Sequence, residues 1–180
     1  MKVTQLSPQQ RAELAAQSLT YDEVGATKQE LPAAYGHLLR TVTLPADCDF
    51  ERACAALRQW QVPLRSGVKV AASTPQVGQD EVVVLAIGIG PFRVKAPCRV
   101  VYLIDEPDRC GFAYGTLQGH PVSGEEAFII HRTPDGVVWL TSRSLTRAPR
   151  GRWRIAYPLA LAAQRVYRRR YLRALCGQKP

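Results

Sequence analysis

The chain has 180 residues, of which 46% are hydrophobic and 22% charged, and this balance excludes wholesale disorder and a fibrous repeat. The length is typical of a single domain with its own core. The apolar stretch 82–92 has eleven residues, fewer than the roughly 18 that a membrane-spanning helix needs, so we expect no transmembrane segment.

The five cysteines follow neither a metal-binding nor a disulfide-framework pattern. None are spaced as C-x-x-C, and no histidine lies near enough to complete a zinc site. The first residues include Lys2, Arg11 and Glu13 and lack the apolar core of an export signal. We therefore expect reduced thiols, a cytoplasmic location, and neither a metal nor a cofactor. The cysteines are Cys48, Cys54, Cys98, Cys110 and Cys176.

The net charge of +9 is concentrated towards the C-terminal end. Eleven basic residues and no acidic residue follow Asp135. This asymmetry is compatible with an acidic partner, which would be nucleic acid, an anionic membrane or an acidic ligand. The alternative is a solvated helix face without a partner, because net charge bears on solubility rather than on fold. The candidate contacts to an acidic partner are Arg165, Arg168, Arg169 and Arg173.

The first third of the chain predicts two helices and one short strand. Ser7 and the following Pro and Gln residues form a helix start with a capping box, and this helix ends before Tyr21. Residues 20–39 show no period and are expected to form a loop, followed by a strand over 41–44. Asp47 or Asp49 then caps a second, strongly amphipathic helix that Pro63 stops.

Between residues 67 and 146 the hydrophobic period changes to two, with a turn signal every ten to fifteen residues. The short connections predict an antiparallel meander, because parallel neighbours need a crossover of a dozen or more residues. Together with the strand over 41–44, we expect an α+β fold with a sheet of about seven strands. The six expected strands are 68–70, 81–89, 96–104, 110–117, 126–131 and 137–141.

A helix of about five turns, Ile155 to Leu175, is expected to end the fold. Arg170 falls inside its apolar arc, where it either snorkels to the surface or pairs with a buried carboxylate. The arc consists of Leu159, Ala160, Ala163, Val166, Tyr167, Tyr171 and Ala174.

This order of elements resembles the helix-grip fold of the START and Bet v 1-like superfamily, in which a curved sheet grips a long C-terminal helix. The resemblance implies a cavity between sheet and helix, although an α+β sandwich with a filled core would show the same pattern. The expected organisation is an N-terminal helix and loop over 1–39, one α+β domain over 40–176 and a short tail over 177–180.

The segment Gly111–Glu126 holds four glycines, a proline and His120, and so predicts a bend followed by a tight connection. His120 is the natural proton carrier of this segment, with hydrogen bonding to its own loop as the alternative role. Tyr114 and Thr116 share one face of the expected strand and present their hydroxyls on the same side.

Glu125 and Glu126 are adjacent on a strand, so they point to opposite faces and cannot act as a carboxylate pair. One of them is expected to reach inward to Arg170, or to Arg143 on the neighbouring strand.

Four stretches of the sequence are distinctive: Leu19–Thr27, Phe50–Ala53, Ala96–Tyr102 and, above all, Gly111–Phe128. They resemble an uncharacterised bacterial and plant family, domain of unknown function number 1990. The resemblance covers roughly residues 20–175 and implies no activity, ligand or catalytic residue, because none is established for the family.

Three functions remain open. The first is small-molecule binding between the sheet and the last helix, through a few polar groups in an apolar setting. The second is an enzyme with His120 as general acid or base, oriented by Glu125 or Glu126. The third is binding of an anionic surface by the C-terminal arginines. The candidate ligand contacts are Tyr114, Thr116, His120, Glu125, Glu126, Arg143, Tyr167 and Arg170.

Overall fold

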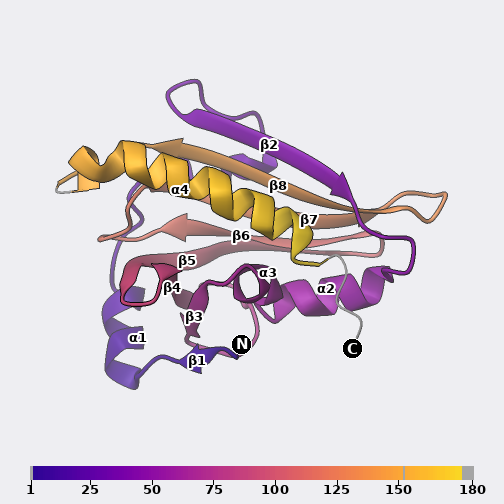
Figure 1. Ribbon diagram of the computed structural model, residues 1–180, viewed down its shortest axis with the longest axis horizontal. Coiled ribbons are helices and arrows are strands. Elements are labelled where there is room, and N and C mark those ends of the chain that lie inside the picture. The colour runs from indigo at the N-terminus through magenta and orange to yellow at the C-terminus, as the bar shows by residue number, and fades with distance from the viewer. Residues whose placement is uncertain (1, 152, 176–180) are drawn as a thin grey trace.

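A single curved sheet organises the computed structural model, which describes residues 2–151 and 153–175 (Figure 1). Strands β3 to β8 form an antiparallel meander in chain order; β2 pairs antiparallel with β8 at one edge, and the short β1 pairs parallel with β3 at the other. The strands are β1 Thr4–Gln5, β2 Gly36–Thr43, β3 Lys69–Ala72, β4 Val82–Ile89, β5 Phe92–Glu106, β6 Arg109–Thr116, β7 Ser123–Arg132 and β8 Val138–Arg147.

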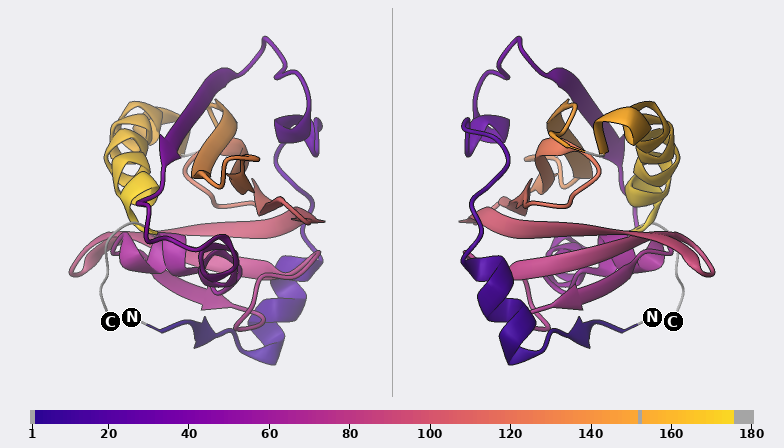
Figure 2. Two further views of the ribbon diagram at one scale, coloured as in Figure 1. Left: turned by 90° about the vertical axis from the view of Figure 1, so that its right-hand side faces the viewer. Right: turned by 90° about the vertical axis from the view of Figure 1, so that its left-hand side faces the viewer.

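The long helix α4 lies across one face of the sheet, and α2 and α3 cover the same face beside it (Figures 1 and 2). This arrangement confirms the expected α+β fold, in which a curved antiparallel sheet grips a C-terminal helix. The helices are α1 Pro8–Ala15, α2 Phe50–Arg58, α3 Gln61–Arg65 and α4 Trp153–Arg173, and a 3-10 turn, η1, lies at Ala26–Lys28. None of the helices within the described ranges is long and apolar enough to cross a membrane.

Strand β2 corrects the expected loop over 20–39, because it begins at Gly36 and pairs with β8 along its whole length. It is an edge strand with no buried residue, and residues 36–40 carry no alternation of apolar and polar residues that would extend the strand expected over 41–44. The expected tail 177–180, like Cys176, lies outside the described residues.

Helix α2 closes one end of the core. Asp49 caps it by accepting a hydrogen bond from the Arg52 amide at 3.0 Å. Trp60, which follows the helix, is fully buried, and its ring meets Phe112 of β6 edge to face at 5.4 Å.

A disulfide joins Cys54 of α2 to Cys110 of β6, with Cα atoms 6.0 Å apart. The expectation of reduced thiols is therefore wrong for this pair. Helix packing brings together two cysteines 56 residues apart, and spacing along the chain cannot reveal such a pair. Cys48 and Cys98 are free thiols.

The segment between α1 and β2 crosses the opposite face of the sheet, where Tyr21 and Tyr35 pack against Leu145. Gly115 makes this approach possible, because a Cβ at this position would overlap the Tyr21 hydroxyl and lie 2.8 Å from its Cε1 atom. The sheet therefore has two covered faces, with α4 on one and the N-terminal segment on the other.

Helix α4 is rotated relative to the expected arc. Among the helix residues that the structure describes, Tyr167 and Tyr171 are buried. Leu159 is 75% and Val166 52% exposed. Arg170 is exposed and lies over the Tyr167 ring at 5.2 Å, which confirms the snorkelling alternative and excludes a buried carboxylate partner for it.

Candidate ligand-binding cavity

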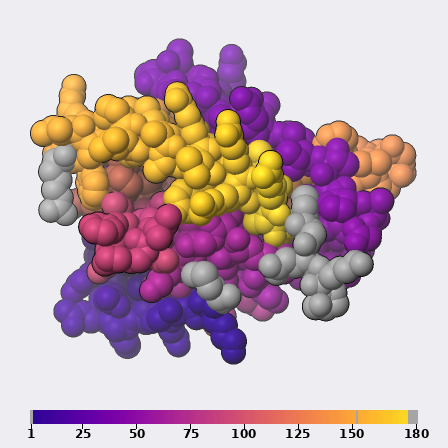
Figure 3. Space-filling view, in the orientation of Figure 1, coloured from indigo at the N-terminus to yellow at the C-terminus, as the bar shows by residue number. Residues whose placement is uncertain are grey.

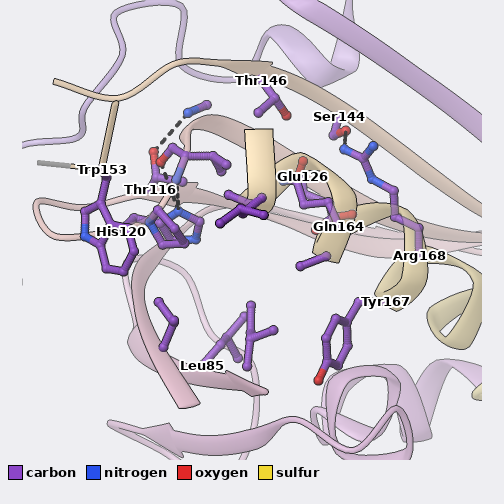
Figure 4. Close-up of a pocket in the computed structure, with 18 of the residues that line it drawn as sticks. Leu85, Thr116, His120, Glu126, Ser144, Thr146, Trp153, Gln164, Tyr167 and Arg168 are labelled. Atoms are coloured by element: carbon purple, nitrogen blue, oxygen red, sulfur yellow. Dashed lines mark hydrogen bonds between the residues drawn. The ribbon is translucent and has the colours of Figure 1, made fainter. Parts of the chain in front are cut away.

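A cavity of about 290 Å³ lies between the sheet and α4 (Figure 4). Its walls are mostly apolar and come from β4, β5, β6, β7, β8 and α4. Phe92 and Leu159 belong to these walls and are largely exposed, so the cavity opens to the surface beside them. The apolar lining includes Leu85, Ile87, Val94, Ala156, Ala160, Ala163 and Tyr171.

Glu126 projects into the cavity from β7. Its carboxylate accepts a hydrogen bond from the Tyr114 hydroxyl at 2.9 Å, and the Ser142 hydroxyl lies 3.4 Å from its second oxygen. Burial raises the pKa of Glu126, although the charge of Arg168 and these two hydrogen bonds lower it in part. A carboxyl group of this kind keeps its proton to a higher pH than one in water.

Arg168 and Gln164 extend from α4 towards the same end of the cavity as Glu126 and Ser144 (Figure 4). Arg168 donates a hydrogen bond from Nη2 to the Ser144 hydroxyl at 2.8 Å. Within the described part of the chain, Arg168 Nε and Gln164 Oε1 are buried and have no hydrogen-bond partner. Such groups are costly to leave unpaired. Helix α4 turns the Arg168 side chain towards the sheet, so Arg168 differs from the exposed arginines that were grouped with it, Arg165, Arg169 and Arg173.

His120 lies near Trp153, at the other end of the cavity from Arg168 (Figure 4). Its Nδ1 atom is 2.9 Å from the Val122 carbonyl oxygen and 3.1 Å from the Val122 amide nitrogen. The ring therefore hydrogen-bonds its own loop, which is the predicted alternative to a role as proton carrier. It does not contact Glu125 or Glu126 as the enzyme hypothesis requires.

Burial lowers the pKa of His120 to about 4, so the ring is neutral near pH 7. The unfolded-state pKa is about 6.5, so the unfolded chain takes up the proton first as the pH falls, and His120 then destabilises the fold. Between about pH 7 and pH 4.5 we expect the native protein to lose about 2 kcal/mol more unfolding free energy than a His120→Gln variant. Urea unfolding of both proteins at the two pH values measures this difference, and equal losses would contradict the assignment.

The structure brings five of the eight predicted contacts to the cavity, and their role in binding stays a prediction. These five are Tyr114, Thr116, His120, Glu126 and Tyr167. Glu125 borders the cavity, but its carboxylate is bonded on the opposite face of the sheet, to Tyr21 and Thr27. Arg143 lies on that opposite face and donates to the Gln29 carbonyl oxygen, and Arg170 reaches solvent.

Sequence reasoning missed the polar residues that α4 and β8 contribute. Two signals were present. Ser142, Ser144 and Thr146 alternate along β8 and place three hydroxyls on one face, and Gln164 and Arg168 are one helical turn apart. Neither pattern entered the prediction, because the apolar residues of α4 indicated a different buried face of the helix.

The topology and the cavity define a helix-grip α+β protein with an apolar pocket that contains a polar cluster. The chain belongs to the family described as Domain of unknown function (DUF1990), whose model matches residues 20–174. It is 44% identical over 138 residues to a UPF0548 protein of Deinococcus radiodurans, covering 70% of this chain and 69% of that protein. A UPF0548 protein of Arabidopsis thaliana is 28% identical over 127 residues, covering 67% of this chain and 61% of that protein.

Among solved structures, the hypothetical protein jhp0584 from Helicobacter pylori is similar in fold, with a TM-score of 0.59 at 9% sequence identity. The match covers 86% of this chain and 97% of that one. A major latex-like protein from Panax ginseng has a TM-score of 0.47 at 16% identity, over 78% of this chain and 99% of its own.

Proposed function

We propose that this protein binds a small amphipathic molecule in the cavity between the sheet and α4. The observation that carries the proposal is the pair of buried, unpaired polar atoms, Arg168 Nε and Gln164 Oε1, at one end of an otherwise apolar cavity. A ligand that accepts a hydrogen bond from Arg168 and donates one to Gln164 satisfies both atoms, while its apolar part fills the remainder.

The volume limits the size of this ligand. A cavity of about 290 Å³ lies at the small end of ligand pockets and equals roughly ten water molecules in bulk volume. A small aromatic or short-chain molecule with one acidic or amide-like end matches these dimensions. Arg168 supports an acidic end, because its guanidinium forms strong hydrogen bonds with anionic oxygens.

A cavity-filling substitution tests the proposal. Ala160 lines the cavity, so Ala160→Phe is expected to weaken binding of the amphipathic anion 1-anilinonaphthalene-8-sulfonate at least about tenfold, by occupying its volume. The dissociation constant comes from a fluorescence titration, and native mass spectrometry of gently purified protein reports any ligand that co-purifies.

Ala162→Phe provides the matched control, because Ala162 is exposed on the same helix and does not line the cavity. It should bind the probe as the native protein does, and thermal unfolding should show that both variants are folded. Native affinity in Ala160→Phe, or an equal loss in both variants, would overturn the proposal.

A further inference from the structure

Large apolar side chains are exposed on one side of the molecule, beside the opening of the cavity. Phe92 is 86% and Ile89 76% exposed at the tip of the β4–β5 hairpin. Ile155 is 90% exposed, and Leu159 and Val166 are also mostly exposed, on the outward side of α4. Exposed apolar residues that gather in this way mark an interaction site more often than isolated ones do.

These side chains belong to neighbouring elements. The hairpin projects below α4 in the ribbon views, and the space-filling view shows its tip next to the helix (Figures 2 and 3). Ile89, Phe92 and Val166 line one apolar groove between the hairpin and α4, with Arg170 at its border. Phe92 and Leu159 also line the ligand cavity, so this surface borders its opening. We refer to Ile89, Phe92, Ile155, Leu159 and Val166 as the docking surface.

The outward side of α4 changes from apolar to basic along its length. At 100° per residue, Ile155, Leu159 and Val166 are followed on the same side by Arg169, Arg170 and Arg173. No acidic residue follows Asp135, so no carboxylate on α4 offsets this charge. Arg169 and Arg173 are both exposed.

We infer that the docking surface binds an anionic phospholipid bilayer, with the hairpin tip and the apolar half of α4 at the headgroup boundary and the arginines on lipid phosphates and carboxylates. The apolar side chains supply the burial that interfacial anchors need, and the arginines supply attraction to acidic lipids. A nucleic acid would use the arginines but would leave the aliphatic side chains without a role. The bilayer therefore accounts for both halves of the surface. This places the opening of the cavity against the membrane, a property beyond small-molecule binding itself.

Co-sedimentation with vesicles tests the inference. The native protein is expected to bind phosphatidylcholine vesicles that contain about 30% phosphatidylserine at least about tenfold more strongly than vesicles of phosphatidylcholine alone. Replacing both apolar residues of the hairpin, Ile89→Ser with Phe92→Ser, should weaken binding to the anionic vesicles at least about tenfold, because their burial is lost. Arg169→Ala with Arg173→Ala should weaken it to a similar extent.

Leu39 and Leu103 are exposed elsewhere, on β2 and β5, so Leu39→Ser with Leu103→Ser is the matched control and should bind as the native protein does. No binding to anionic vesicles at low salt would overturn the inference. Equal binding by the Ile89/Phe92 variant, or duplex DNA as the preferred partner, would also overturn it. Ala160→Phe should keep vesicle binding, so failure of the docking surface is distinguishable from failure of the ligand cavity.

Discussion

Glu125→Gln is expected to lower the unfolding free energy by about 3 kcal/mol, because it breaks a buried carboxylate network. Glu125 is 3% exposed. Its oxygens accept hydrogen bonds from the Tyr21 hydroxyl at 2.6 Å, the Gly25 amide at 2.7 Å and the Thr27 amide at 3.0 Å, and also from the Thr27 hydroxyl. An amide in place of the carboxylate turns one acceptor into a donor that faces other donors. Urea unfolding near pH 7 measures the loss.

Glu126→Gln is the matched comparison at the adjacent position. Burial raises the pKa of Glu126, so the carboxylate is disfavoured there, and a neutral amide should leave stability unchanged or raise it by about 1 kcal/mol. Glu126→Gln should also change the dissociation constant of the sulfonate probe, because Glu126 lines the cavity beside Arg168. Equal destabilisation by the two substitutions would contradict the division of roles between these residues.

The period of two along β7 was sufficient to predict that Glu125 and Glu126 face opposite sides of the sheet. It was not sufficient to predict the hydrogen-bond partners of either carboxyl group. The partners of Glu125 lie in the segment after α1, about a hundred residues away, and that segment shows no regular period. The structure now explains two of the stretches that carry the family resemblance, since Leu19–Thr27 and Gly111–Phe128 contact each other through Tyr21, Gly115 and Glu125.

Helix α4 shows where a hydrophobic pattern fails. The pattern selects the most apolar arc, and this arc includes Leu159 and Val166, which face outward. The side that faces the sheet includes Gln164 and Arg168, because part of it borders a cavity rather than a packed core. A sequence pattern that contradicts the final packing is expected at functional positions, where burial of apolar residues is not the main requirement. Both proposals depend on this rotated helix: the polar cluster on its inner side and the docking surface on its outer side.

Reduction of the Cys54–Cys110 disulfide is expected to lower the unfolding free energy by about 4 kcal/mol, the largest effect among these predictions. The bridge closes a loop with a sequence separation of 56 residues, and a loop of this length restricts the unfolded chain strongly. It also ties α2 to the centre of the sheet, where Trp60 and Phe112 pack in the same cluster. Urea unfolding with and without a reducing agent measures the difference.

Cys48→Ser is the control, because Cys48 is a half-buried free thiol and its loss should leave sensitivity to reduction intact. Cys54→Ser with Cys110→Ser should unfold at the same lower urea concentration whether or not reductant is present. Thiol titration of the denatured, unreduced protein should then find at least two of the five cysteines blocked, since Cys54 and Cys110 are in the bridge. Five free thiols together with unfolding that is insensitive to reductant would show that the pair is reduced and that packing alone holds α2 on β6.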